Sequence, residues 1–406
     1  PAIDAMAAAD GNMETAWAAP AGPQRIVFDL GRAREFGGVR LRWKPGRHAT
    51  RYAVSLSSDG STWRTGREVT RGNGGDDWIA LPEAEARYIA LDLQTGSADG
   101  YALAEAEVLP LSFSAHPNDV IRAIAAESPR GWFPRGFSGE QPYWTILGVD
   151  GGLQQGLIGE DGAVEVARGG FSIEPFVRVD GRLVTWADVQ ATQSLQDGYL
   201  PIPGVEWKHG DLQLKITAFA HGTPNDSRLV LRYRLTNPGR RAHDYTLALA
   251  IRPFQVNPPA QFLNTQGGVS EIRELSFDGA TVSVAGVPRV FSKQIPDGAF
   301  ATPFDAGMEV VHLASGRYPA DTAVRDDTGL ASGALLYRMR LQGWESREVQ
   351  VMVPMTGTAA LARRWWDAEV LQQGVADEWR SKLDRVRIEL PPQAREVADT
   401  PRTARA

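Results

Sequence analysis

The fold of this chain is constrained most by a two-residue hydrophobic alternation that recurs in short runs between clusters of turn residues. Successive side chains of a β-strand point to opposite faces, so this alternation is typical of strands with one buried face. Several short strands without a helical period predict a β-sandwich in the first hundred residues. The runs there are Arg25–Leu30, Val39–Trp43, Tyr52–Ser57, Trp78–Leu81 and Tyr88–Leu93.

The alternation continues from residue 132 to residue 356, where Asp180-Gly181 and Asp278-Gly279 are hairpin signals. This segment has too many strands for a small sandwich, so we expect two large antiparallel sheets packed face to face. The predicted fold class of the chain is therefore mainly β. The runs are Phe171–Val179, Leu212–Ala220, Leu229–Asn237, Tyr245–Arg252, Thr281–Ala285, Leu335–Leu341 and Glu348–Val353.

Two segments depart from the alternation. Residues 111–131 lose it and contain helix-start chemistry, so we interpret them as a linker. Residues 357–406 change to a helical period and are predicted to form short helices, which Gly374 divides. The apolar positions of the two predicted helices are Leu361, Trp365, Ala368 and Leu371, then Trp379, Leu383 and Val386.

Length and composition limit the kind of protein. A chain of 406 residues indicates two or three domains. The absence of cysteine excludes disulfides, thiolate metal sites and a cysteine nucleophile. A net charge of −6 argues against a nucleic-acid partner, and no apolar run is long enough to predict a membrane span. The chain opens at Pro1 without an initiating Met or a signal peptide, so we expect a processed or trimmed product.

The stretch from residue 250 to residue 268 ends a predicted strand and continues as a proline-stiffened loop. Arg252, Gln255 and Asn257 lie in it beside Phe254 and Phe262. Polar groups next to aromatic faces suit a sugar-binding surface. The alternative is a buried corner whose amides cap backbone groups. The sequence leaves both interpretations open.

Three of the twelve tryptophans are candidates for stacking on a sugar ring. Trp144 and Trp207 lie in the middle segment, and Trp78 lies near a predicted loop of the first hundred residues, as do Arg47 and His48. An aromatic face is what a pyranose ring stacks on. A sandwich of this size also needs large core residues, so each tryptophan has a core interpretation as well.

Residues 1–110 resemble the coagulation factor 5/8 type C, or discoidin-like, domain. The resemblance implies an eight-stranded jelly-roll that often serves as a carbohydrate-binding module, with ligands held in variable loops at one end. The four motifs that carry it occur in order, at Ala9–Trp17, Val27–Gly31, Tyr52–Trp63 and Ala104–Val108.

The same resemblance implies a structural calcium ion at the Asp-Gly-Asn turn. Ca²⁺ takes six to eight oxygen ligands, and Asp10, Asn12 and Thr15 with Glu105 supply oxygens of the right kind. The alternative is an ordinary Asx turn, which the same residues form without a metal.

Residues 132–356 resemble the β-supersandwich that precedes an (α/α)₆ toroid in glucoamylase-like glycoside hydrolases and glycoside phosphorylases. Residues 357–406 would then lead as a helical linker into a catalytic toroid that lies outside this sequence. The likeness is one of element order and of aromatic-rich loops. The segments that carry it are Tyr143–Gly148, Gly198–Trp207 and Arg252–Pro259.

No catalytic constellation is visible, so no catalytic residue is predicted. A glycosidase needs two carboxylates across one cleft, and the spacing of the candidate carboxylates pairs none of them. Six scattered histidines lack zinc-site spacing, and neither a Gly-x-Ser-x-Gly elbow nor a phosphate-binding loop occurs. The candidate carboxylates are Asp150, Glu174, Glu206 and Asp211.

Three functions fit these observations. The first is the non-catalytic N-terminal part of a bacterial, periplasmic or secreted carbohydrate-active enzyme, which binds or positions a poly- or oligosaccharide for a catalytic (α/α)₆ domain. The second is a stand-alone envelope protein for glycan binding or adhesion. The third is one subunit of a processed enzyme whose catalytic half stays bound. The sequence names neither the sugar nor the linkage.

Overall fold

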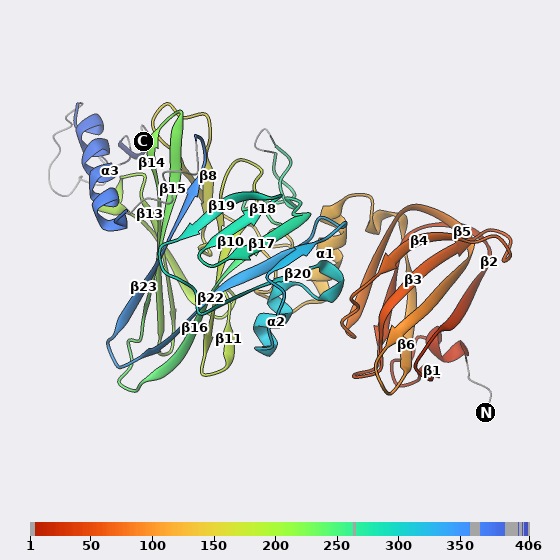
Figure 1. The fold of residues 1–406 in the computed structure, drawn as a ribbon. Helices are drawn as coiled ribbons and strands as arrows, with labels where there is room; N and C mark the ends of the chain where they lie inside the picture. The colour runs from red at the N-terminus through yellow and green to blue at the C-terminus, as the bar shows by residue number, and fades with distance from the viewer. Residues whose placement is uncertain are drawn as a thin grey trace. The chain divides into compact units, whose positions relative to one another are not determined.

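The structure is a computed structural model that describes residues 5–262, 265–357, 366–385, 397, 400 and 402–404. The chain divides into two compact units. The first contains Pro1–Ser128 with Pro303–Gly307, and the second contains Pro129–Thr302 with Met308–Ala406. Both are built mainly from antiparallel strands (Figure 1), which confirms the predicted fold class.

The first unit is built on a six-stranded antiparallel sheet with the strand order β1-β6-β2-β5-β3-β4. A short 3₁₀ helix, η1 (Ala5–Ala8), precedes it. The strands are β1 (Trp17–Ala19), β2 (Gln24–Trp43), β3 (Ala49–Ser57), β4 (Arg64–Val69), β5 (Asp76–Gly96) and β6 (Tyr101–Leu109).

Two of these strands are longer than the sequence pattern indicates. The predicted runs Arg25–Leu30 and Val39–Trp43 are both parts of β2, and the last two predicted runs are both parts of β5. The β2–β5 register shifts where β2 bends, between Asp29 and Arg34. Such irregularities bend a strand without ending it, which explains why the sheet has six strands where the resemblance implies eight.

The core of the first unit contains one buried carboxylate. Asp77 Oδ2 accepts hydrogen bonds from Trp43 Nε1 at 2.8 Å and from the Tyr52 hydroxyl at 2.7 Å. Burial raises the pKa of Asp77 to about 6, even though both donors favour the ionised form. Most of the other core side chains are apolar, with Trp17, Phe36 and Leu41 among them.

The predicted linker contains a 3₁₀ helix, η2 (Leu111–Phe113), and a helix, α1 (Pro117–Glu127), and both lie in the first unit. The helix starts where helix-start chemistry was expected, because His116 accepts a hydrogen bond from the Asn118 amide. Phe113 packs so closely on β2 that a Cβ at Gly38 would come within 3.0 Å of its ring. Glycine at this position therefore permits the contact.

The second unit contains two antiparallel sheets, as predicted. The eight-stranded sheet has the order β20-β22-β16-β10-β9-β8-β7, with β11 paired to β10. Its strands are β7 (Trp144–Leu147), β8 (Gly156–Gly159), β9 (Val164–Glu165), β10 (Ser172–Val179), β11 (Arg182–Val184), β16 (His243–Arg252), β20 (Gly298–Thr302) and β22 (Ser332–Leu341).

The nine-stranded sheet has the order β12-β13-β14-β15-β23-β19-β18-β17-β21. Its strands are β12 (Gln190–Leu195), β13 (Pro203–His209), β14 (Leu212–Thr223), β15 (Asp226–Thr236), β17 (Glu274–Asp278), β18 (Thr281–Val284), β19 (Val287–Ser292), β21 (Ala323–Arg325) and β23 (Ser346–Pro354). All seven predicted runs of this unit fall on observed strands.

One apolar core lies between the two sheets. It takes alternate residues of β16, namely Tyr245, Leu247, Leu249 and Ile251, and alternate residues of β14 and β15 in the facing sheet. The predicted hairpin at Asp180-Gly181 joins β10 to β11, with positive φ at both residues. The two-residue period therefore predicts which side chains fill this core.

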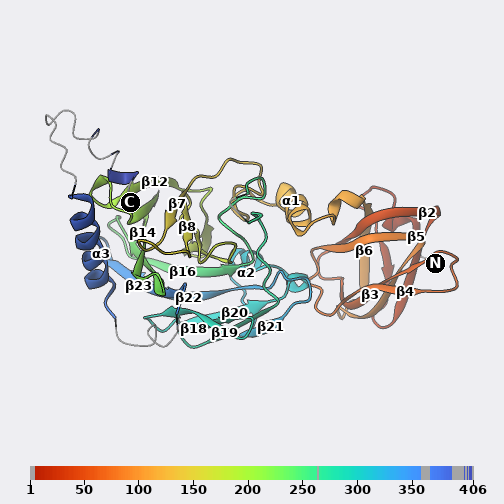
Figure 2. The ribbon, with the colours of Figure 1, turned by 90° about the horizontal axis from the view of Figure 1, so that it is seen from above.

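A single helix, α3 (Ala368–Leu383), packs against β14 and β15 of the same unit (Figures 1 and 2). It runs through Gly374 without a break, so the prediction that this glycine divides two helices is wrong. Ala368, Trp379 and Leu383 are buried on the sheet, as the helical period indicated. Leu361, Trp365 and Val386 lie outside the described residues.

The remaining helices are short: η3 (Gln196–Gly198), η4 (Phe304–Ala306) and α2 (Glu309–Ser315). None of the helices that the structure describes is long and apolar enough to cross a membrane.

Candidate functional site

The turn at residues 10–15 brings together the four residues that the sequence predicts as calcium ligands. Asp10 Oδ1 accepts a hydrogen bond from the Asn12 amide at 2.9 Å, which is the Asx-turn geometry. Thr15 Oγ1 lies 2.8 Å from Asp10 Oδ2. Glu105 of β6 is distant in sequence but contacts the turn, because its Oε2 accepts a hydrogen bond from the Gly11 amide at 2.9 Å.

Oxygen atoms are crowded within this turn. Thr15 Oγ1 lies 3.0 and 2.8 Å from the two Asp10 carboxylate oxygens, and 2.8 Å from the Asn12 carbonyl oxygen. A hydroxyl has one hydrogen to donate, so at least one of these three close contacts between oxygens has no hydrogen between them. Oxygens gathered at such distances suit a hard cation such as Ca²⁺.

A second group of loops lies at one end of the first unit, around His48. The His48 carbonyl accepts a hydrogen bond from the Ser97 amide at 2.9 Å, and Ser97 Oγ lies 3.2 Å from His48 Nδ1. Arg47 Nε donates to the Asp99 carbonyl at 3.1 Å. A Cβ at Gly74 would overlap the His48 ring, so a third loop closes on it. We call Arg47, His48, Ser97 and Asp99 the loop surface.

The loop surface carries neutral and charged polar groups. Burial lowers the pKa of His48 below its usual value, so its imidazole is neutral at pH 7 and offers one donor and one acceptor. Asp99 is exposed, and Arg47 is partly exposed. Lys44 Nζ donates to the Met13 carbonyl, which connects this end of the unit to the turn at residues 10–15.

Trp78 is half-buried in β5 and packs against protein groups. The Arg40 guanidinium lies 4.0 Å from the centre of its ring, and the Phe113 ring stacks on it at 5.8 Å. Trp78 thus belongs to the small cluster between the sheet and α1. Trp78 also lines a cleft beside α1, so its role in stacking on a sugar stays a prediction.

In the second unit, residues 252–258 form a buried corner, whereas Phe262 farther along the same loop is exposed. Gln255 Nε2 donates to the Gln266 carbonyl at 2.9 Å, and Asn257 Nδ2 donates to the Thr265 carbonyl at 3.2 Å. Both side chains are at most 5% exposed. The structure therefore corrects the sugar-contact prediction for them: the amides cap backbone groups, as the alternative interpretation proposed.

Arg252 is fully buried at the end of β16. Its Nη1 lies 2.8 Å from Glu174 Oε2, and its Nε lies 2.6 Å from Glu309 Oε1 of α2. Nη2 donates to the Trp132 carbonyl at 2.7 Å. One cation thus pairs with two buried carboxylates, and no part of it reaches the surface. The prediction that Arg252 binds a sugar hydroxyl is corrected on this ground.

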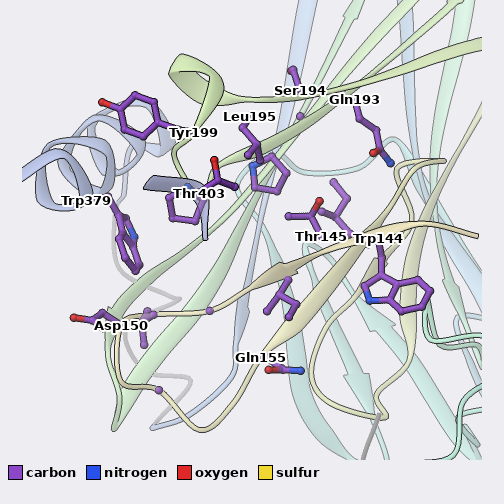
Figure 3. Close-up of a pocket in the computed structure, with 18 of the residues that line it drawn as sticks. Trp144, Thr145, Asp150, Gln155, Gln193, Ser194, Leu195, Tyr199, Trp379 and Thr403 are labelled. Carbon is purple, nitrogen blue, oxygen red and sulfur yellow. The ribbon is translucent and has the colours of Figure 1, made fainter. Parts of the chain in front are cut away.

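The two tryptophans of the second unit lie in different surroundings. Trp207 is 1% exposed in the core between the sheets, where its Nε1 donates to the Asp161 carbonyl at 3.1 Å. Its core interpretation holds, so it has no face for a sugar. Trp144 is half-buried on β7 and lines a cleft of about 710 Å³ (Figure 3).

The cleft also contains residues that the sequence analysis did not select. Tyr199 and Trp379, which are far from Trp144 in the sequence, line the cleft together with Gln154 and Gln193. No short motif marks these residues, because they come from the turn after η3, from α3, from a loop and from β12, and meet only in the folded chain.

The carboxylates considered for catalysis each form an ion pair with a separate basic group. The pairs are Asp150–Lys382 at 3.1 Å, Glu174–Arg252 at 2.8 Å, Glu206–Lys208 at 3.0 Å and Asp211–His243 at 3.1 Å. Within the described ranges, no three His, Asp or Glu side chains gather in a way that would hold a metal ion.

The comparison with protein families defines the first unit. Residues 3–107 match the family model described as the F5/8 type C domain. The match supports a discoidin-like domain in this part of the chain, as the four motifs predicted. The match ends before α1 and does not reach the second unit.

Several solved structures are similar to this chain. Chitosan-binding module 2 of a chitosanase/glucanase from Paenibacillus sp. IK-5, solved with chitotriose, is 35% identical, covers 26% of this chain and 86% of its own, and has a TM-score of 0.25. CBM32 of AlyQ, in complex with 4,5-unsaturated mannuronic acid, is 24% identical over 27% of this chain and 88% of its own, with a TM-score of 0.25.

A GH29 fucosidase variant from Ruminococcus gnavus, in complex with fucose, is 24% identical over 26% of this chain and 22% of its own, with a TM-score of 0.24. The comparison with curated proteins found no match. The resemblance of the second unit to a β-supersandwich therefore stays a prediction.

The burial of Arg252 predicts a structural role for it. Arg252→Met leaves Glu174 and Glu309 buried without their cation, so we expect the free energy of unfolding to fall by about 3–5 kcal/mol. Chemical denaturation measures this change. The matched control is Arg340→Met, which removes an exposed ion pair to Asp244 and should cost less than about 1 kcal/mol. Unchanged stability of the Arg252 variant with lost glycan affinity would contradict the structural role.

Proposed function

We propose that the first unit binds a glycan at the loop surface. The observation that carries the proposal is the F5/8 type C family match over residues 3–107. Two features of the structure support it. The loop surface is formed by loops at an end of the unit, and the resemblance implies a ligand in loops of this kind. It offers a neutral imidazole, a guanidinium and a carboxylate to ring hydroxyls.

An amino-sugar oligomer is the first ligand class that we propose. The 35%-identical module was solved with chitotriose, and Asp99 gives the loop surface an exposed carboxylate. A carboxylate attracts the protonated amine of glucosamine units, whereas neutral hydroxyls suffice for an N-acetylated chain. Chitotriose and its N-acetylated form are therefore the two probes.

The test is calorimetric titration of the whole chain with chitotriose, with N,N′,N″-triacetylchitotriose and with a panel of neutral trisaccharides. We expect one of these sugars to bind, and Arg47→Ala to weaken that binding by about tenfold through the loss of hydrogen bonds to a charged group. Arg32→Ala is the control, because Arg32 is an exposed arginine at the bend of β2. Equal affinity in both variants would contradict binding at the loop surface.

We propose further that the turn at residues 10–15 holds Ca²⁺. The support is the crowding of oxygens around Thr15 Oγ1 and the approach of Glu105. Asp10 and Glu105 would supply carboxylate oxygens, with Asn12 and Thr15 adding neutral ones. The ion would fix the turn and add no chemistry to ligand binding.

Calcium binding predicts a stability change. Ca²⁺ at about one hundred times its dissociation constant should raise the free energy of unfolding by about 2.7 kcal/mol. Asp10→Ala should abolish this response in thermal unfolding. Asp59→Ala is the control, because Asp59 also accepts amide hydrogens in an Asx turn, from Ser61 and Thr62. Loss of the response in both variants, or no response in the parent, would refute the site.

We also propose that the chain is the non-catalytic N-terminal part of an exported bacterial glycoside hydrolase. The support is the element order of the second unit and the presence of a glycan-binding type of module before it. The alternative, a stand-alone envelope protein for glycan binding, makes the opposite prediction about what accompanies this chain.

Peptide mapping and intact-mass measurement of the protein from its native source separate the two. Peptides that continue past Ala406 into a helical domain, or a second chain that copurifies, support the hydrolase. A chain that ends at Ala406 and purifies alone counts against it and favours the envelope protein.

A further inference from the structure

The cleft beside Trp144 lies where the two sheets of the second unit each present an edge strand. β7 is the last strand of the eight-stranded sheet, and β12 is the last strand of the nine-stranded sheet. Both contribute side chains to the cleft, as do α3 and Tyr199, which follows η3. An edge strand carries unpaired backbone N–H and C=O groups. The cleft therefore has polar backbone along its sides.

Aromatic side chains stand at both ends of this cleft. Figure 3 shows Trp144 on one side and Trp379 on the other, with Thr145 and Leu195 between them. The volume of about 710 Å³ is within the range of about 300–1,000 Å³ that small-molecule sites occupy. A half-buried tryptophan beside an open volume of this size offers a ring face to a ligand.

The polar lining consists mainly of neutral groups. Gln155, Gln193 and Ser194 line the cleft with amide and hydroxyl groups, and Gln193 of β12 is exposed. Amides and hydroxyls can both donate and accept hydrogen bonds, as the hydroxyls of a sugar do.

The charges of the lining restrict the ligand further. Asp150 is the one carboxylate among the lining residues, and its Oδ2 lies 3.1 Å from Lys382 Nζ. The described lining contains no arginine, lysine or histidine, but Lys382 lies beside it, with Nζ 5.3 Å from the centre of the Trp379 ring and 2.6 Å from Glu378. Phosphorylated, sulfated or uronic-acid ligands would therefore have to compete with Asp150 and Glu378 for this cation. Hydroxyl-rich neutral molecules suit amides and aromatic faces without one.

We propose that this cleft is a second glycan site, which binds a neutral oligosaccharide with one ring stacked on Trp144 and a hydroxyl bonded to the side-chain amide of Gln193. The site consists of residues of the second unit alone. It therefore does not depend on the loop surface of the first unit, and either site can fail without the other.

The test is calorimetric titration of the whole chain with cellotetraose, maltotetraose and laminaritetraose at millimolar concentrations. We expect at least one to bind, and Trp144→Ala to weaken that binding by about tenfold. Trp344→Ala is the matched control, because Trp344 is 72% exposed on the β22–β23 turn and is not among the cleft residues. Arg47→Ala, at the loop surface, should also leave this affinity unchanged.

A second variant tests the proposal independently, in case Trp144→Ala does not fold. Gln193→Met keeps the length of an exposed cleft side chain and removes its amide, so the melting temperature should stay unchanged while the affinity falls. The proposal is overturned if none of the three tetrasaccharides binds, or if both variants bind as tightly as the parent. It is also overturned if Arg47→Ala abolishes the same binding, since the loop surface would then be the only site.

Discussion

The second unit depends on the burial of apolar faces between two large antiparallel sheets. Each sheet contributes every second residue of its strands to one core, and Trp207 and Tyr233 are buried there beside Leu247 and Ile251. Because the side-chain period is two, a slip of one residue in any strand would turn its core residues outward. The register of the strands is thereby fixed, and with it the edge at which β7 and β12 line a common cleft.

Much of this fold follows from local sequence. The alternation along residues 245–251 predicts a strand and its buried face, and Asp180-Gly181 predicts the turn that the structure shows. Where an element distant in sequence covers a strand residue, the alternation does not predict the burial of that residue. Arg252 lies at the end of that same strand, and its burial follows from the approach of Glu309 on α2, which no local pattern predicts.

The candidate sites also differ in how far local sequence predicts them. Asp10 and Thr15 are near neighbours in the chain, so a motif locates their turn, and only Glu105 had to come from elsewhere. Trp144 and Trp207 are alike as residues of short strands, and their different exposure is set by which strand is at an edge and which is covered. Strand order is a property of the whole sheet, so the sequence left both interpretations open.

Trp379 contributes both to the packing of α3 and to the lining of the cleft. Its ring is buried in the cluster that holds α3 on the sheet, and its edge lines the cleft. A molecule that touches Trp379 in the cleft therefore stabilises the docked helix, and by reciprocity a firmly docked helix improves the cleft as a site. The local unfolding of α3 is therefore coupled to the occupancy of the cleft, and amide hydrogen exchange in α3 should slow when the cleft is occupied.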